Sequence, residues 1–218
     1  MMKSMIKTIA NKNKLTSKLV AIYSLIWKGS YLNRVGWFES FRQNMPCEEN
    51  KRALPWFTYG SIAFLEKRIN KEMYVFEYGS GNSTIWWSGR VSNVVSCEHD
   101  REWYSHMKSK FANNVEYLHF DLVPGGDYSK EILKYKDTFD IVVIDGRDRV
   151  TCVKNSIPAL KSNGVIIWDN SDRDEYTEGY DFLASNLFKR LDFVGMGPIN
   201  TEGWCTSIFY RSNNCMGI

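Results

Sequence analysis

The chain has 218 residues, of which 44% are hydrophobic and 24% charged, a composition typical of a soluble domain whose core needs no metal or disulfide to fold. Its five cysteines are an odd number without a CxxC pair, which argues against a zinc cluster or a disulfide framework and favours the cytoplasm. Seven of the 28 basic residues lie in residues 1–38, which hold no acid, and the other 21 are outnumbered by 25 acids, so we expect no nucleic-acid partner.

The basic N-terminal arm contains an apolar run at residues 19–27, preceded by lysines. This run is too short to span a bilayer, and no small-residue cleavage site of a signal peptide follows it. We expect an amphipathic helix that docks on the body of the protein or on a membrane interface. A peripheral membrane contact and an acidic partner both stay open, while a solvated basic helix is the favoured interpretation.

Residues 36–58 look like an irregular connection with aromatic anchors, and residues 61–68 have helical spacing. Strands and helices then alternate. Strands are expected at residues 73–78, 94–98, 115–120, 139–144, 164–168, 193–196 and 206–210, and helices at residues 82–89, 101–111, 150–160 and 180–189. Apolar strands alternating with helices predict a Rossmann-like, doubly wound α/β sheet that is mostly parallel. We therefore divide the chain into a basic helical N-terminal segment with its connection (residues 1–70) and a main domain (residues 71–218).

Residues suited to ligand binding or catalysis stand at the ends of five expected strands. They are Gly79, Glu98, Asp121, Asp145 and Asp169. Ligands of open α/β sheets bind beyond the carboxyl ends of the strands. This distribution is harder to explain by chance than any single motif, and it predicts one binding crevice.

The turn after the first main-domain strand runs from Glu77 to Thr84 and contains Gly79 and Gly81, which allow a tight turn and a close approach of the ligand. A pyrophosphate-binding turn would carry a third glycine where Ser83 stands, and Glu77 would repel phosphate. An acid at this place suits a cationic ligand such as S-adenosylmethionine, which has an ammonium and a sulfonium group.

Glu98 lies 17 residues after Gly81, a spacing typical of an acid that binds ribose hydroxyls. A tight turn followed by an unrelated surface glutamate stays open as the alternative.

The segments FEYGSGNST, SCEHD, FDIVVIDG and GVIIWDN together resemble the class I S-adenosylmethionine-dependent methyltransferases over about residues 70–211. The resemblance implies a seven-stranded sheet whose last strand, residues 206–210, is antiparallel. It places Glu77 and the glycines at the methionine part, Glu98 at the ribose and Asp121 at the adenine. The full set of expected cofactor-binding residues is Glu77, Gly79, Ser80, Gly81, Asn82, Ser83, Glu98, His99, Asp121 and Asp145.

A metal site is predicted where Asp145 and the pair Asp169 and Asn170 follow neighbouring strands, because such strand ends lie about 5 Å apart. Two carboxylates and an amide oxygen suit Mg²⁺ or Ca²⁺. The pattern is similar to the metal-dependent O-methyltransferases of the catechol and caffeoyl-coenzyme A type. Alternatively, Asp169 and Asn170 cap the next segment, and Asp145 lies near the sulfonium without a metal.

The chain departs from those enzymes because no lysine follows the first aspartate; the run is Asp145-Gly146-Arg147-Asp148-Arg149. Asp148 is the candidate general base, with Asp145 the second candidate catalytic residue. The arginines either bind an acidic substrate or pair with nearby acids.

The predicted function is methyl transfer from S-adenosylmethionine (EC 2.1.1.-), directed to an oxygen of a small molecule or a sugar and assisted by a divalent cation. The N-terminal stretch looks like that of uncharacterised bacterial methyltransferases and specifies no substrate. The alternatives are an NAD(P)-dependent oxidoreductase and a non-catalytic nucleotide-binding module.

Overall fold

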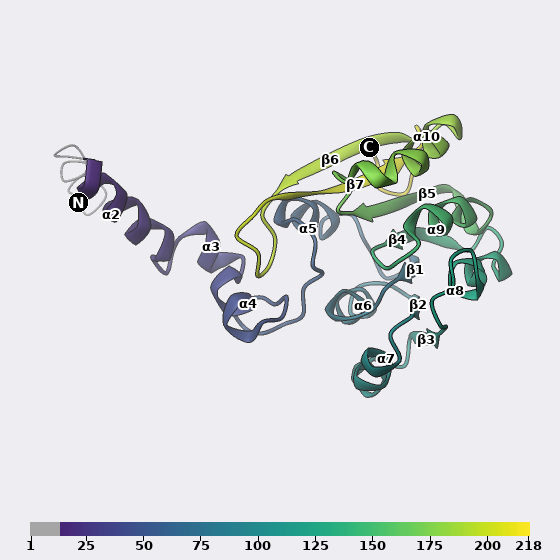
Figure 1. Cartoon of the computed structure of the whole chain (residues 1–218), viewed down its shortest axis with the longest axis horizontal. Helices are drawn as coiled ribbons and strands as arrows, with labels where there is room; N and C mark the ends of the chain where they lie inside the picture. Colours follow the sequence, from purple (N-terminus) through teal and green to yellow (C-terminus); the bar gives the residue numbers. More distant parts are fainter. Residues whose placement is uncertain (1–13) are drawn as a thin grey trace.

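The computed structural model describes residues 14–218, so Lys3, Lys7 and Lys12 of the basic arm lie outside the described residues. A seven-stranded sheet forms the centre of the molecule (Figure 1), with the strand order β3-β2-β1-β4-β5-β7-β6. The strands are β1 (Tyr74–Tyr78), β2 (Asn93–Glu98), β3 (Val115–His119), β4 (Phe139–Ile144), β5 (Leu160–Asp169), β6 (Lys189–Gly195) and β7 (Trp204–Tyr210).

The first five strands pair in parallel, and β7 pairs antiparallel with both β5 and β6. The predicted Rossmann-like sheet with an antiparallel last strand is therefore confirmed. Strand β1 pairs with β2 on one side and with β4 on the other, so the strand order reverses at this point. Such a switch point leaves a crevice beyond the carboxyl ends of the two central strands.

Helices cover both faces of this sheet (Figure 1). The helices are α2 (Lys14–Ile26), α3 (Tyr31–Arg34), α4 (Trp37–Gln43), α5 (Tyr59–Leu65), α6 (Asn82–Ser88), α7 (Arg101–Met107), α8 (Asp127–Lys130), α9 (Arg149–Ser156) and α10 (Thr177–Ser185), with short 3-10 turns at Lys108–Lys110, Glu131–Lys134, Ile157–Ala159 and Asp174–Tyr176.

Alternate residues of each central strand enter two separate apolar cores. Val142 and Ile144 of β4 pack in the core that α8, α9 and α10 cover, while Ile141 and Val143 pack in the core beneath α5 and α6. All four side chains are fully buried. Burial on both faces explains why these strands read as continuous apolar runs in the sequence.

The segment before residue 70 contributes to the second core. Leu54 and Phe57 are buried there, together with Ile62 and Leu65 of α5. The division at residue 70 stays a prediction, and residues on both sides of it pack into this one core.

Several sequence-based boundaries were wrong. Strand β5 begins at Leu160 rather than at residue 164, and helix α7 ends at Met107 rather than at residue 111. Residues 36–58 contain helix α4 and are not wholly irregular. Helix α9 ends at Ser156, because Pro158 has no N–H to donate to the carbonyl four residues earlier. Helix α10 ends at Ser185 and β6 begins at Lys189, because Leu187 has a left-handed backbone (φ 65°) that breaks the helix.

None of the residues of α2 is buried, so the expected docking of this helix on the body of the protein is wrong. The helix projects from one end of the molecule (Figure 1). Within residues 14–218, no helix has the length and apolar character needed to cross a membrane.

The two-core packing predicts unequal effects for the same substitution on two strands. Val142→Ala removes buried methyl groups from β4 and is expected to lower the free energy of unfolding by about 2 kcal/mol. Val194→Ala on β6, where the side chain is 80% exposed, is the matched control and should change it by less than about 0.5 kcal/mol. Urea unfolding of both variants measures the difference, and equal effects would contradict the assignment of the core.

Candidate active site

The glycine turn brings the end of β1 against the end of β4. Gly79 has a left-handed φ of 93°, and a Cβ at this position would lie 3.2 Å from the backbone of Asp145 and Gly146. Gly81 has a φ of 154° and precedes the first residue of α6. The positive φ favours glycine at both positions, and Gly79 in addition allows a close approach that a side chain would hinder, so the predicted turn has a structural reason at both glycines.

Glu77 lies directly beneath this turn and is fully buried. Its Oε2 accepts a hydrogen bond from Thr84 Oγ1 at 2.5 Å, whereas its Oε1 has no hydrogen-bond partner within residues 14–218. The pKa of Glu77 is raised to about 8, chiefly by burial and in smaller part by the charges of Asp145 and Glu98, while the hydrogen bonds from Thr84 and Ser83 oppose the rise. A cation bound near this carboxyl would lower its pKa again.

Glu98 organises the neighbouring strand end. Its Oε1 accepts the backbone N–H groups of His99 (2.8 Å) and Asp100 (2.9 Å), and its Oε2 accepts Ser80 Oγ at 2.6 Å. Trp103 Nε1 also donates to the carbonyl of Ser80 at 3.0 Å. The acid expected at the ribose is therefore fixed in place and joins the glycine turn to the second strand end.

Arg149 is the buried cation of the site, at 8% exposure. Its guanidinium donates to Asp145 at both the carbonyl oxygen and Oδ1 (3.1 Å each), to the carbonyl of Gly146 at 2.9 Å and to the carbonyl of Asp169. This one side chain thus joins the carboxyl ends of β4 and β5.

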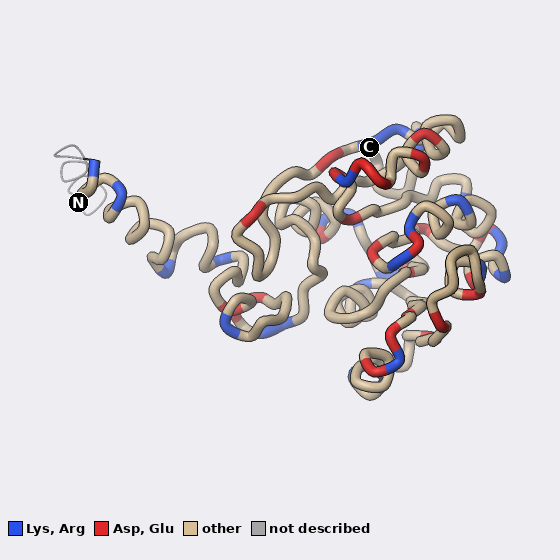
Figure 2. The backbone as a smooth tube through the Cα atoms, viewed as in Figure 1, with Lys and Arg blue, Asp and Glu red and all other residues tan. Residues whose placement is uncertain are grey.

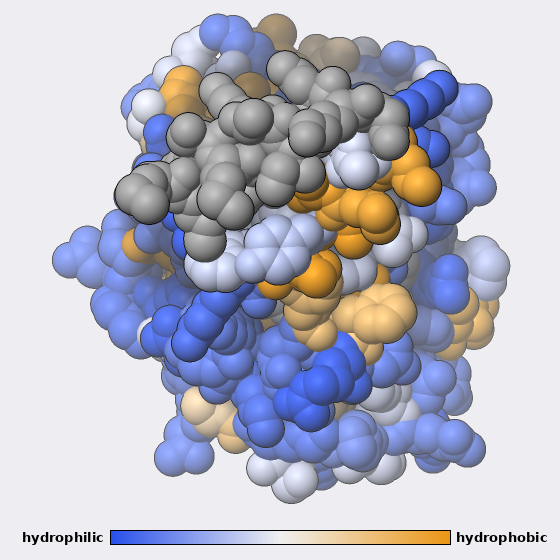
Figure 3. Space-filling model, turned by 90° about the vertical axis from the view of Figure 1, so that its left-hand side faces the viewer, coloured by the Kyte–Doolittle hydropathy of each residue, from blue (hydrophilic) through white to orange (hydrophobic). Residues whose placement is uncertain are grey.

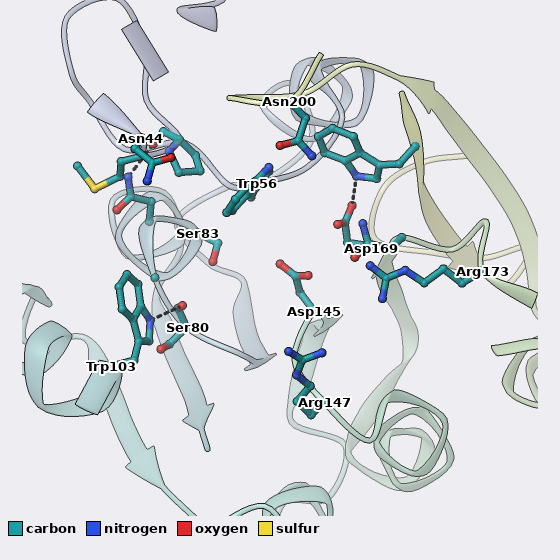
Figure 4. Close-up of a pocket in the computed structure, with 16 residues that line it drawn as sticks. Asn44, Trp56, Ser80, Ser83, Trp103, Asp145, Arg147, Asp169, Arg173 and Asn200 are labelled. Atoms are coloured by element: carbon teal, nitrogen blue, oxygen red, sulfur yellow. Dashed lines mark hydrogen bonds between the residues drawn. The ribbon is translucent and has the colours of Figure 1, made fainter. Parts of the chain in front are cut away.

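The Asp169 carboxylate points away from Arg149 and toward β7. Its Oδ1 accepts Trp204 Nε1 at 2.9 Å (Figure 4). The same oxygen accepts Thr206 Oγ1 at 2.6 Å. Burial and the neighbouring charge of Asp145 raise the pKa of Asp169, and burial also raises the pKa of Asp145, where Arg149 opposes it. Two neighbouring buried carboxyls, of which only Asp145 pairs with the arginine, favour at least one protonated form.

Two cavities, of about 650 Å³ and about 420 Å³, open at these strand ends. They share Asp145 as the most central carboxyl, and its side chain points into the space opposite Ser83 and Trp56 (Figure 4). The full set of shared lining residues is Ser80, Ser83, Trp103, Asp145, Arg147 and Arg173. The two cavities therefore form one continuous cleft with Asp145 at the junction.

Most of the predicted cofactor-binding residues meet in this cleft. Those that line one or both cavities are Gly79, Ser80, Gly81, Asn82, Ser83, Glu98, His99 and Asp145. Glu77 supports the turn from below, whereas Asp121 lines neither cavity. The side chain of Asp121 is 77% exposed and lies 3.5 Å from Arg101, because the chain turns outward after β3.

The predicted general base, Asp148, is placed elsewhere. Its carboxylate accepts the N–H of Gly125 and the hydroxyl of Thr151, both at 2.8 Å, and it lines neither cavity. Asp148 therefore links the start of α9 to the loop before α8. Asp145, the other candidate catalytic residue, is the one that faces the cleft.

The residues of the predicted metal site do not fit a divalent cation. Asp169 directs Oδ1 to Trp204 and Thr206, and Asp145 is already paired with Arg149. Arg147 and Arg173 also line the cleft, which adds positive charge where a cation would bind. Asn170 does line the larger cavity. The metal site stays a prediction, and the charges around it argue against it.

The N-terminal segment contributes Asn44, Met45, Pro46 and Trp56 to the far wall of the larger cavity, which the sequence did not predict. Asn200 of the β6–β7 loop and Trp204, the first residue of β7, complete this wall. Asn82 Nδ2 donates to the carbonyl of Pro46 at 2.6 Å, so its amide holds this wall against the first residue of α6. The aromatic anchors noted at residues 36–58 were the available signal, but no spacing rule connects them to the strand ends.

No known family model matches the chain, and no curated protein sequence matches it. Among solved structures, the chain is similar to a precorrin-6y C5,15-methyltransferase from Geobacter metallireducens (TM-score 0.57, 16% identity, covering 78% of this chain and 96% of that one). It is also similar to a precorrin-8w decarboxylase from Methanobacterium thermoautotrophicum (TM-score 0.53, 15% identity, 78% and 97% covered) and an rRNA methylase from Streptococcus thermophilus (0.51, 14%, 71% and 96%). At these identities the similarity establishes the fold, which is the Rossmann-like fold of the class I methyltransferases.

The buried carboxyl of Glu77 predicts a pH dependence of stability. Its pKa is about 8 in the folded protein and about 4.3 in an unfolded chain. Between these values the folded state keeps a proton that the unfolded state has lost, so this group lowers the stability as the pH rises. In Glu77→Gln we expect a shallower fall of the unfolding free energy between about pH 5 and pH 8, by up to ~1.4 kcal/mol per pH unit.

Urea unfolding at several pH values measures this difference. Glu202→Gln, a substitution of an exposed glutamate in the β6–β7 loop, is the matched control and should keep the wild-type slope. Parallel slopes for wild type and Glu77→Gln would show that Glu77 is ionised in the folded protein.

Proposed function

We propose that this chain is an S-adenosylmethionine-dependent methyltransferase that methylates an oxygen of a small molecule. The observation that carries the proposal is the gathering of the glycine turn, Glu98 and Asp145 around one cleft at the switch point of the sheet. Two of the three similar structures are named as methylating enzymes and one as a decarboxylase. The fold alone therefore does not identify the reaction, and the proposal depends on the residues of the site.

The buried carboxyls beside the glycine turn support a cationic cofactor at that end of the cleft, whereas Arg147 and Arg173 border the position of the predicted metal site. Glu77 has a buried oxygen without a partner within residues 14–218, and burial raises the pKa values of both Glu77 and Asp145. An ammonium or sulfonium nearby would favour their ionised forms. NAD(P) offers the opposite charge, because its pyrophosphate would lie beside these carboxyls. The electrostatics thus favour S-adenosylmethionine over the oxidoreductase alternative.

When bound, S-adenosylmethionine supplies an electrophilic methyl group on sulfur. The residues of this chain then have three tasks. The glycine turn and Glu98 orient the donor, the tryptophan-lined far wall excludes water and orients the acceptor, and Asp145 accepts the proton that the acceptor hydroxyl loses as its oxygen takes the methyl group. A raised pKa makes Asp145 a stronger base than an exposed aspartate.

We place the methyl acceptor in the larger cavity, whose size favours a small molecule. Its volume of about 650 Å³ is within the usual range for small-ligand sites. Trp56, Trp103 and Trp204 line it, and indole rings pack well against aromatic or sugar rings. Arg149 already neutralises Asp145, so the proposed proton transfer needs no divalent cation.

Cofactor binding is tested by isothermal titration. We expect S-adenosylmethionine to bind and NAD to give no measurable heat. Glu98→Ala removes the acceptor of three hydrogen bonds at the strand end and should weaken binding by roughly tenfold to a hundredfold. Glu102→Ala, at an exposed position on α7, is the matched control. Tight binding of NAD without binding of S-adenosylmethionine would end the proposal in favour of an oxidoreductase.

Methyl transfer is tested with labelled S-adenosylmethionine and a pool of hydroxylated metabolites in the presence of EDTA. We expect wild-type protein to transfer label, and Asp145→Asn to bind the cofactor but transfer at least roughly a hundredfold more slowly, because the base is lost. Asp174→Asn, in an exposed turn beside the cleft, should behave as wild type. Loss of transfer in EDTA with recovery on adding Mg²⁺ would restore the metal-assisted mechanism, and a fully active Asp145→Asn would remove the proposed base.

A further inference from the structure

Helix α2 presents an apolar stripe that stays exposed among residues 14–218. Leu15, Leu19, Ile22 and Ile26 recur at helical spacing along its 13 residues, so they lie on one face. Their exposed fractions are 68%, 57%, 55% and 55%. Exposed isoleucines and leucines gathered on one face of a helix mark an interaction surface rather than ordinary surface scatter.

Basic residues border this stripe. Lys14 and Lys18 lie on the same helix, and Lys28 and Arg34 follow it, whereas the first acid of the whole sequence is Glu39. Figure 2 shows basic residues but no acidic ones along α2 and α3, and Figure 3 shows an apolar patch beside hydrophilic surface at this end of the molecule. A partner surface that is both apolar and negatively charged would match this helix.

Two aromatic rings lie at the carboxyl end of the helix. Tyr23 and Trp27 are 46% and 45% exposed, and their ring centroids are 5.9 Å apart. Tyrosine and tryptophan prefer the boundary between lipid tails and head groups, where an apolar ring meets a polar edge. The composition of α2 therefore suits a lipid interface better than the apolar groove of another protein.

The helix is attached to the body through hydrogen bonds at its end. Ser30 Oγ donates to the carbonyl of Leu25 at 2.6 Å, and Asn33 Nδ2 donates to the carbonyls of Ile26 and Trp27 at 3.0 Å each. Farther along the chain, Trp37 Nε1 donates to the carbonyl of Asn200 at 2.9 Å, and Asn200 lines the cleft. The projecting helix is thus connected through α3 and α4 to the wall of the candidate site.

From these contacts we propose that α2 is an interfacial anchor that lies in the surface of an anionic lipid membrane. The apolar stripe enters the head-group boundary, the lysines contact the lipid phosphates, and the catalytic body stays in the aqueous phase. Binding of this kind depends on apolar burial and on charge together. The charge repulsion between two basic helices disfavours a second copy of the chain as the occupant.

Vesicle co-sedimentation tests this anchor with the full-length protein. Wild type should sediment with vesicles of mixed phosphatidylcholine and phosphatidylglycerol, bind pure phosphatidylcholine weakly, and lose binding at high salt. Leu19→Glu combined with Ile22→Glu should lower the bound fraction by roughly tenfold or more. Leu187→Glu, at a leucine that is 81% exposed on the body, is the matched control and should bind as wild type.

Three measurements keep the test decisive. Circular dichroism and cofactor titration should be unchanged in the double variant, which separates loss of the anchor from loss of the fold or of the cofactor site. Wild type that fails to sediment with anionic vesicles, or a double variant that sediments equally well, would overturn the proposal. Sedimentation velocity without lipid measures the oligomeric state. If wild type and Leu187→Glu are dimers and the double variant is a monomer, the partner of α2 is a second copy of the chain, and the proposal is overturned.

Discussion

The candidate site depends on one buried guanidinium. Arg149 holds the carbonyl groups at the ends of β4 and β5 and pairs with Asp145 between them. A buried charge is costly unless it is paired and fully hydrogen-bonded. Arg149 meets that condition only when the carboxyl ends of β4 and β5 both lie within hydrogen-bonding distance of its guanidinium. The same contacts place Asp145 at the junction of the two cavities. The side chain of Asp169 instead accepts hydrogen bonds from β7.

The carboxyls around this arginine outnumber it, and burial raises the pKa values of Glu77, Asp145 and Asp169. An empty cleft of this kind favours protonated carboxyls, and a cationic ligand favours ionised ones. The cost of burying these acids is thus offset when the proposed cofactor binds. On the proposed function, the site would lower the stability of the free protein and raise its affinity toward a positively charged molecule, a common arrangement at functional sites.

The N-terminal segment is part of this site, although most of it lies outside the strand-helix alternation. Thr206 Oγ1 donates to Asp169 and accepts the N–H of Thr58, and Asn82 binds the carbonyl of Pro46. The wall of the larger cavity is therefore held by the same strand ends that hold the cofactor side. The same segment thus lines the larger cavity and carries the exposed amphipathic helix α2, so the two proposals would connect the choice of substrate to the location of the protein.

The sequence by itself determined the sheet, the glycine turn and most of the residues around the cofactor cleft. These features are local. Apolar runs specify strands, turns with positive φ require Gly79 and Gly81, and the position of an acid at a strand end follows once the strand itself is assigned.

The sequence did not determine what Asp148, Asp169 and Arg149 contact, nor that Trp56 and Pro46 line the cavity. Those contacts join segments distant in the chain, and a carboxylate at a strand end has the same sequence pattern whether it faces a ligand, a loop or a neighbouring strand. Only the packing of α9, β7 and the N-terminal segment against the sheet decided between them, because burial and hydrogen-bond partners set the direction and the charge of each side chain.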